Sequence, residues 1–351
     1  NQVIKMYGAA TDIHDSKDAA DALREREEKF RSIFEGIDEG YTLQELILDD
    51  EGNVTDVIYR EVNQAFAKQL GIANGAGKRL KELFPNVEQY WLDSLTSVYK
   101  TGEPLRVEGY QADLGRWMTA HYVRIEASGG PLISAVFQDI TERKQHEQLH
   151  EFLLNFSDAL RVEENPEAMA SRALGILLKE LHLDHCCIAL IRQADNYIEV
   201  IHQVTAKETP ELPKDGIYLS NILEAPDLVF NRTLVINDIL EWESLSETSR
   251  KYLSSLGLQS ILCVTLRKGD NAPHWLIAVA SGTPRRWTGS DISMIEQVSE
   301  RTWSALEAAK AGEALREREI RMRTLADAIP HIIWGNNANG AANYFNKRWY
   351  E

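Results

Sequence analysis

The sequence has few cysteines, a deficit of basic residues and no long apolar run. Three cysteines occur in 351 residues, an odd number without a regular spacing, which is typical of a reducing compartment. Lys and Arg total 38 against 54 Asp and Glu, which gives a net charge of −16 and argues against nucleic acid or an anionic membrane as a partner. No apolar stretch approaches the roughly 20 residues that cross a bilayer. We therefore expect a cytoplasmic chain with no membrane contact from this segment.

The composition is that of folded protein, at a length too great for one typical core. Hydrophobic residues make up 44% and charged residues 26%, as in ordinary globular domains. At 351 residues we expect two or three domains. The chain opens in a strand-like run at residues 1–4 without a start methionine. This opening suggests an excerpt from a longer polypeptide, whose other parts leave room for a membrane anchor.

Two segments of the chain repeat each other at an offset of 292 residues. Residues 22–37 read ALREREEKFRSIFEGI and residues 314–329 read ALREREIRMRTLADAI. Their apolar residues recur in steps of seven, three and four, which place them on one helical stripe of the coiled-coil kind. These residues are Leu23, Phe30, Ile33 and Ile37, aligned with Leu315, Met322, Leu325 and Ile329. The repeat predicts a connector helix used twice, although the same spacing also suits a helix that lies on its own domain.

A third helical stripe follows the run Asp139-Ile140-Thr141. Its apolar residues recur in steps of four, three and four, and they are Leu149, Leu153, Phe156 and Leu160. Asp and Thr at such a junction accept backbone N–H bonds and so begin a helix. Asp12-Ile13 precedes the first connector in the same way. The sequence thus predicts a recurring unit of strand, Asp-Ile, amphipathic helix and new domain.

Between the connectors lie two segments with the pattern of an α+β fold. The first, residues 38–141, contains five strand-like runs around a stretch of short helices, at 41–48, 57–62, 105–110, 116–125 and 132–137. The second, residues 165–303, begins and ends with an apolar helix and contains five apolar runs, at 186–191, 198–204, 234–237, 261–266 and 275–280. In each segment this order predicts an antiparallel sheet with helices packed on one face.

The first segment resembles a PAS domain. The resemblance rests on the strand Arg116–Ile125, on the ending Asp139–Lys144, and on Asn63–Phe66 at the start of the helix after the second strand. Residues 1–17 resemble the end of an earlier PAS domain, and residues 330–351 resemble the start of a later one.

The second segment resembles a GAF domain in the runs Leu234–Ile239, Leu256–Leu266 and Pro284–Thr288. Glu300–Glu307 is similar to helices that end GAF domains in sensor histidine kinases. The two resemblances imply the following division: an end of a preceding PAS domain at 1–17, a connector helix at 18–37, a PAS domain at 38–144, a GAF domain with flanking helices at 145–312, a connector helix at 313–329 and the start of a following PAS domain at 330–351.

These resemblances imply the sensory input region of a bacterial two-component sensor histidine kinase, the protein that starts a phosphorelay. Such a region passes ligand or conformational signals through its connector helices to an output domain, with Asp139, Ile140 and Thr141 as the junction. The stripes Leu149–Leu160 and Leu23–Ile37 are then expected to pair helices in a homodimer. Two alternatives stay open: a ligand-free dimerisation scaffold, and the input region of a cyclic-dinucleotide synthase or hydrolase.

A small-molecule ligand of open identity is a further expectation. Alternation along the strand 116–125 puts Trp117 and His121 on one face and Tyr122 on the other, so that one face meets the cavity side of the sheet. We take Trp117, His121 and Tyr122 as candidate ligand contacts, although packing beneath the helices explains them equally well. The cofactor is unknown, since the sequence has no signature for a covalent bilin, a flavin or a haem.

We expect no catalytic residue and no metal site in this segment, and therefore no enzyme activity of its own. His146 and His150 each precede a glutamate, as in a phosphoacceptor box, but the arginine and proline that continue such a box are absent. Residues 182–187 contain histidine, aspartate and cysteine in close order. A structural zinc site needs a second ligand pair at a similar spacing, and none is near.

Overall fold

The computed structural model describes residues 14–127, 130–163, 165–192, 195–206, 209–213, 215–222, 233–267 and 273–351. The chain divides into two compact units, at residues 1–147 and 148–351. Within the described ranges, no helix is both long enough and apolar enough to span a bilayer. Residues 1–13, which hold most of the expected end of an earlier PAS domain, lie outside the described residues.

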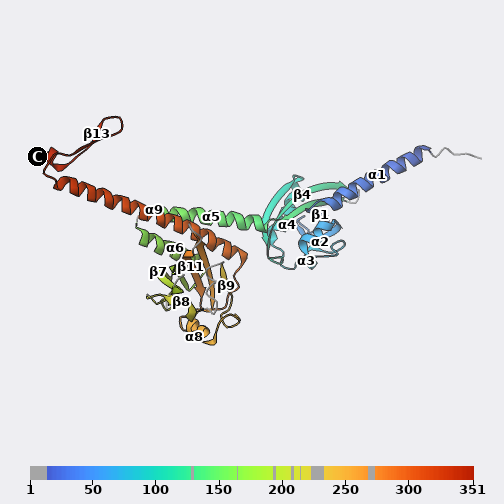
Figure 1. Ribbon diagram of the computed structural model, residues 1–351. Helices are drawn as coiled ribbons and strands as arrows, with labels where there is room; N and C mark the ends of the chain where they lie inside the picture. The colour runs from blue at the N-terminus through green and yellow to red at the C-terminus, as the bar shows by residue number, and fades with distance from the viewer. Residues whose placement is uncertain are drawn as a thin grey trace, which may run out of the picture. The chain divides into compact units, whose positions relative to one another are not determined.

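The first domain is a five-stranded antiparallel sheet with helices on one side (Figure 1). In the spatial order β2-β1-β5-β4-β3, its strands are β1 (Gly40–Leu48), β2 (Val54–Val62), β3 (Leu105–Gln111), β4 (Arg116–Ala127) and β5 (Gly130–Asp139). The helices between β2 and β3 are α2 (Gln64–Leu70), α3 (Leu80–Leu83) and α4 (Gln89–Thr101). The predicted α+β class with an antiparallel sheet is confirmed.

Alternating burial on β4 explains how the helices pack. Met118, Ala120 and Tyr122 are buried, because successive side chains on a strand point to opposite faces. They share one apolar cluster with the buried residues of α4, which are Trp91, Leu92, Leu95 and Val98. Gly102 ends α4 at a φ of 76°, a left-handed conformation that glycine adopts without steric cost.

The second domain is a six-stranded antiparallel sheet that is covered on both faces (Figure 1). In the order β8-β7-β6-β11-β10-β9, its strands are β6 (His185–Arg192), β7 (Tyr197–Thr205), β8 (Ile217–Tyr218), β9 (Leu234–Ile236), β10 (Ser260–Arg267) and β11 (Pro273–Ser281). One face carries α6 (Pro166–Glu180) and the first part of α9 (Gly289–Ala328), and the other carries α8 (Glu247–Ser255). The expectation of helices on one face only is wrong for this domain.

Successive residues of β6 enter two separate apolar clusters. Cys186 and Ile188 belong to the cluster beneath α6 and α9, and Cys187 and Ala189 belong to the cluster on the other face. A strand buried on both faces forms a continuous apolar run, which is why the sequence revealed the strand. The helix on the other face, α8, was not predicted from the sequence, because it buries only Leu253 among its apolar residues and so shows no apolar periodicity.

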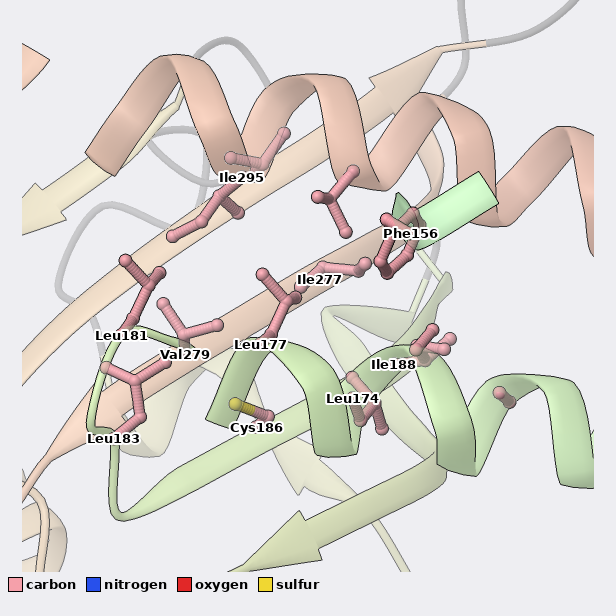
Figure 2. Close-up of a cluster of buried hydrophobic side chains, with 14 of the residues drawn as sticks. Phe156, Leu174, Leu177, Leu181, Leu183, Cys186, Ile188, Ile277, Val279 and Ile295 are labelled. Atoms are coloured by element: carbon pink, nitrogen blue, oxygen red, sulfur yellow. The ribbon is translucent and has the colours of Figure 1, made fainter. Parts of the chain in front are cut away.

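Helix α5 (Thr141–Arg161) contributes to the core of the second domain. Leu153, Phe156 and Leu160 are 1–2% exposed and share one cluster with residues of α6, α9 and the sheet. Figure 2 shows Phe156 in this cluster together with Ile277 and Ile295. These three side chains therefore pack within their own chain, and the expectation that they pair with a second copy is wrong for them.

Apolar stripe residues of both repeated connectors are exposed in the single chain. In α1 (His14–Gly36), the side chains of Leu23 and Phe30 lie outside the described residues, and Ile33 is 69% exposed. In the second repeat, the four stripe residues are between 42% and 67% exposed; Leu315, Met322 and Leu325 lie in the last part of α9, and Ile329 is the extended residue that follows the helix.

A buried asparagine ties α1 to the hairpin that follows it. The Nδ2 of Asn63 donates to the carbonyls of Phe34 and Glu39 at 3.1 and 2.9 Å. Its Oδ1 accepts from the N–H of Tyr41 at 2.9 Å and from the N–H of Phe66 at 3.0 Å. One side chain thus joins the end of the helix, the first strand and the start of α2.

The same junction recurs after α9. Asn346 follows the hairpin of β12 (Trp334–Asn336) and β13 (Ala342–Phe345). Its Nδ2 donates to the carbonyls of Ala326 and His331, both at 2.9 Å, and its Oδ1 accepts from the N–H of Ile333 at 2.9 Å. These three partners are offset by 292 residues from Phe34, Glu39 and Tyr41, which is the offset of the sequence repeat.

Candidate ligand cavity and sheet-to-helix junction

A cavity of about 70 Å³ lies in the first domain between the sheet and its helices. Its lining is drawn from all five strands and from the helical segment between β2 and β3. The lining residues are Thr42, Gln44, Tyr59, Leu70, Leu80, Phe84, Val87, Trp91, Leu95, Gln111, Met118, Ala120, Tyr122, Ala135 and Phe137. None of these residues, all in the described part of the chain, carries a formal charge at neutral pH.

Gln44 brings an unpaired polar atom to this cavity. Its side chain is buried, and its Nε2 donates to Thr42 Oγ1 at 2.7 Å. Among the described residues, its Oε1 has no hydrogen-bond partner, and neither has the Nε1 of Trp91. A buried polar atom without a partner costs about 1–3 kcal/mol, so a bound molecule that pairs with Gln44 stabilises the domain.

Two buried tyrosines add hydroxyl groups to the lining. Burial, followed by the closeness of Tyr122, raises the pKa of Tyr59 far above its ordinary value. Burial likewise raises the pKa of Tyr122, with a smaller contribution from Tyr90. Both hydroxyls stay protonated and neutral at physiological pH, so they are available as hydrogen-bond donors.

The structure divides the three predicted ligand contacts between the two faces of β4. Tyr122 lines the cavity, whereas Trp117 and His121 lie on the opposite face, so the prediction is wrong for these two. The polar residues Thr42 and Gln44 were missed. Their positions, two apart on a strand whose alternate residues are buried, are the signal that identifies them, because a buried strand face is ordinarily apolar.

The predicted junction Asp139-Ile140-Thr141 connects β5 to α5 by hydrogen bonds in both directions. Asp139 Oδ1 accepts from the N–H of Thr141 at 2.9 Å, and Thr141 Oγ1 accepts from the N–H of Trp117 at 3.0 Å. The N–H of Ile140 donates to the carbonyl of Trp117 at 2.8 Å. Asp139 also forms an ion pair with Arg116 at 3.3 Å. The start of α5 is therefore fixed to the end of β5 and to β4.

The first turn of α5 is also held to β3 by charge. Glu108 contacts Arg143 at 2.8 Å and Lys144 at 2.9 Å. The hydrogen bond from Lys144, and with it that from Arg143, holds the pKa of Glu108 below its ordinary value. The ammonium of Lys144 lies 5.8 Å from the ring centre of Trp117, within cation–π range. Trp117 thus belongs to the junction, beside the helix.

The three thiols do not fit covalent attachment of a bilin. Cys186 and Cys187 lie on β6 and Cys263 on β10. Burial raises the pKa of Cys186 well above its ordinary value, and raises the pKa of Cys187 and of Cys263 to about 12. The thiolate is the reactive form of cysteine, and these residues hold little of it at neutral pH.

Two protein families match the chain, one over the first two strands and the helices of the first domain and the other over the second domain. The model of the PAS domain matches residues 28–102, and the model of the GAF domain matches residues 165–306. An uncharacterised protein of Sinorhizobium fredii, y4lL, is 30% identical over 117 residues, which are 31% of this chain and 13% of that protein. The chain thus spans a minor part of the length of this curated relative.

Solved structures with similar folds include photoreceptors and one enzyme. The chromophore-binding domain of bacteriophytochrome RpBphP3 from R. palustris is 15% identical, over 77% of this chain and 94% of that one, with a TM-score of 0.40. Free methionine-R-sulfoxide reductase from Neisseria meningitidis is 12% identical, over 47% and 91%, with a TM-score of 0.38. Similarities of this size say nothing of ligand or activity. The family matches and the two antiparallel sheets together show that the chain contains a PAS domain and a GAF domain.

Proposed function

We propose that this chain is the signal-input region of a bacterial sensor histidine kinase and that α5 carries the signal from its PAS domain. The observation that supports this most directly is the continuity of α5, an uninterrupted helix over Thr141–Arg161. Its first turn is bonded to the PAS sheet through Glu108. Its later turns are buried in the GAF core at Leu153 and Phe156. A shift of the sheet therefore acts on a helix that is a structural part of the next domain.

Ligand binding in the PAS cavity supplies the signal. The cavity is lined by β4 and β5 residues, among them Tyr122 and Ala135, and at the junction with α5 β4 begins and β5 ends. A ligand shifts an equilibrium between two arrangements only by binding one of them better. The bonds of Asp139 and Thr141 to β4 and of Glu108 to α5 are the contacts that differ between such arrangements.

The exposed stripe of α9 supports a homodimer. Four apolar side chains at heptad-like spacing remain exposed within the described part of the chain, from Leu315 to Ile329, and each is worth about 1.5–3 kcal/mol when fully buried. The stripe repeats the pattern of α1, so a second copy offers a matching surface at both helices. The chain as a dimer in the cytoplasm is part of this proposal.

The junction after α9 supports a further PAS domain that starts near residue 330. Asn346 bonds to three residues that lie 292 positions after three partners of Asn63, although the two asparagines themselves are 283 positions apart. The β12–β13 hairpin corresponds in this comparison to β1 and β2. The signal would then pass from the GAF domain along α9 into a second PAS sheet on its way to the output domain.

The output of the full-length protein tests this function. Purified protein is incubated with labelled ATP to detect a phosphohistidine, and in parallel with GTP to detect a cyclic dinucleotide. Phosphohistidine formation supports the kinase, and cyclic-dinucleotide turnover supports the alternative of a synthase or hydrolase. If neither product forms, the alternative of a ligand-free scaffold is favoured.

A matched pair of variants tests the route through α5. Glu108→Gln removes the charge that holds Arg143 and Lys144, whereas Glu103→Gln changes an exposed glutamate just before β3. We expect the output rate to change with Glu108→Gln and to stay at the wild-type value with Glu103→Gln. Equal rates in both variants would contradict transmission through this contact.

A further inference from the structure

The chemistry of the PAS cavity restricts what it accepts. Its polar lining consists of amide, hydroxyl and indole N–H groups, from Thr42, Gln44, Tyr59, Trp91, Gln111 and Tyr122. A buried ion requires a partner of opposite charge, and the lining residues provide none. An uncharged ligand is therefore favoured over a carboxylate, a phosphate or an ammonium.

The volume restricts the size of the ligand. The cavity measures about 70 Å³, under half of the roughly 150 Å³ cavity that binds benzene. The space therefore suits a ligand of only a few non-hydrogen atoms. An aromatic ring or a tetrapyrrole exceeds it.

We propose that the PAS cavity binds a small uncharged primary amide, with the amide group of the ligand paired to the side chain of Gln44. This inference rests on the proposed sensory function and specifies the ligand class of the same site. The Oε1 of Gln44 needs a donor, which the NH₂ group of a primary amide supplies. The Nε1 of Trp91 needs an acceptor, which the carbonyl oxygen of the ligand supplies, and the hydroxyls of Tyr59 and Tyr122 are further donors in the same lining.

Four probe molecules separate this proposal from its competitors. Acetamide carries the donor and the acceptor, acetone has the same shape without the donor, acetate has the same shape with a charge, and benzamide has the amide group on a larger body. The indole N–H resonance of Trp91, a lining residue, reports on occupancy in ¹⁵N-tryptophan-labelled protein. It is assigned by its loss in Trp91→Phe.

We expect acetamide to shift the Trp91 resonance saturably and about tenfold more tightly than acetone, because a buried acceptor gains its missing donor. A ligand of four non-hydrogen atoms binds no more tightly than about 40 µM, so the titration extends into the millimolar range. Acetate and benzamide should give no saturable shift. In Gln44→Met, which keeps the length of the side chain and removes its amide, the preference for acetamide over acetone should fall to within about twofold.

The outcomes distinguish the ligand class from the function. Binding of acetone or benzamide as tight as that of acetamide overturns the amide class and leaves the cavity as a ligand site. No shift with any probe overturns ligand binding in this cavity. The wild-type comparison of acetamide with acetone decides the proposal even where Gln44→Met fails to fold. Transmission through α5 is judged separately, by the output rates of Glu108→Gln and Glu103→Gln.

Discussion

The apolar stripes of α5 and of the last part of α9 share their spacing and differ in their surroundings. Leu153 and Phe156 are 2% and 1% exposed, whereas Met322 and Leu325 are 64% and 57% exposed. The α5 stripe meets α6, α9 and a sheet face. The last fully buried apolar residue of α9 is Leu306, so its later turns run on without a sheet to cover. The spacing of a stripe therefore identifies the face of a helix, and the neighbours available in the fold decide what covers it.

Truncating one side chain in the α5 stripe and one in the α9 stripe should give the largest difference in the free energy of unfolding. Phe156→Ala should destabilise the GAF domain by about 3–5 kcal/mol, because it leaves a cavity in a packed core. At a concentration too low for dimers, Leu325→Ala should change the free energy of unfolding by no more than about 0.5 kcal/mol, since the residue is exposed in the single chain. Urea unfolding followed by tryptophan fluorescence measures both, because Trp275 lies in the cluster of Phe156. Equal losses of stability in the two variants would contradict the difference in packing between the α5 and α9 stripes.

A smaller effect is expected at the asparagines that follow the two repeated connectors. Asn63→Ala should destabilise the first domain by about 1–3 kcal/mol, because buried N–H and C=O groups of the backbone lose their partner. Asn63→Asp keeps the acceptor and loses the two donor bonds, and it should fall between alanine and wild type. Asn346→Ala should free the β12–β13 hairpin from α9. Hydrogen exchange at the N–H of Tyr41 and of Ile333 measures the loss at each junction, and unchanged protection in the alanine variants would contradict the assigned role.

The smallest effect on stability is expected where α5 begins. Glu108→Gln should leave the unfolding midpoint nearly unchanged, because the ion pairs of Glu108 are largely exposed and exposed pairs contribute little. Its effect should instead be seen as faster hydrogen exchange in the first turn of α5 at low salt. Raising the salt concentration should abolish the difference between variant and wild type. A difference that persists at high salt would show that charge is not its cause.

Sequence periodicity revealed more of the fold than of the site. Apolar runs and alternation, as at Cys186–Ile191, predicted every strand of both sheets except β8 (Ile217–Tyr218), which is too short to form a pattern. Capping residues predicted the Asp139-Ile140-Thr141 junction. Helix α8, which covers the second face of the GAF sheet, was not predicted, since a single buried leucine forms no periodic pattern in the sequence. Gln44 was missed because a single sequence does not show which face of a strand meets a cavity. The partner of each helical stripe depends on packing between distant segments, which spacing does not encode.

The mass of the chain in solution tests the difference between the two stripes most directly. We predict that the wild-type chain sediments at twice its 39.8 kDa and that the double variant Met322→Glu and Leu325→Glu sediments at 39.8 kDa. Its circular dichroism should match that of the wild type, because both residues are exposed in the single chain. A wild-type chain that stays at 39.8 kDa at high concentration, or a double variant that stays a dimer, would contradict pairing through the α9 stripe.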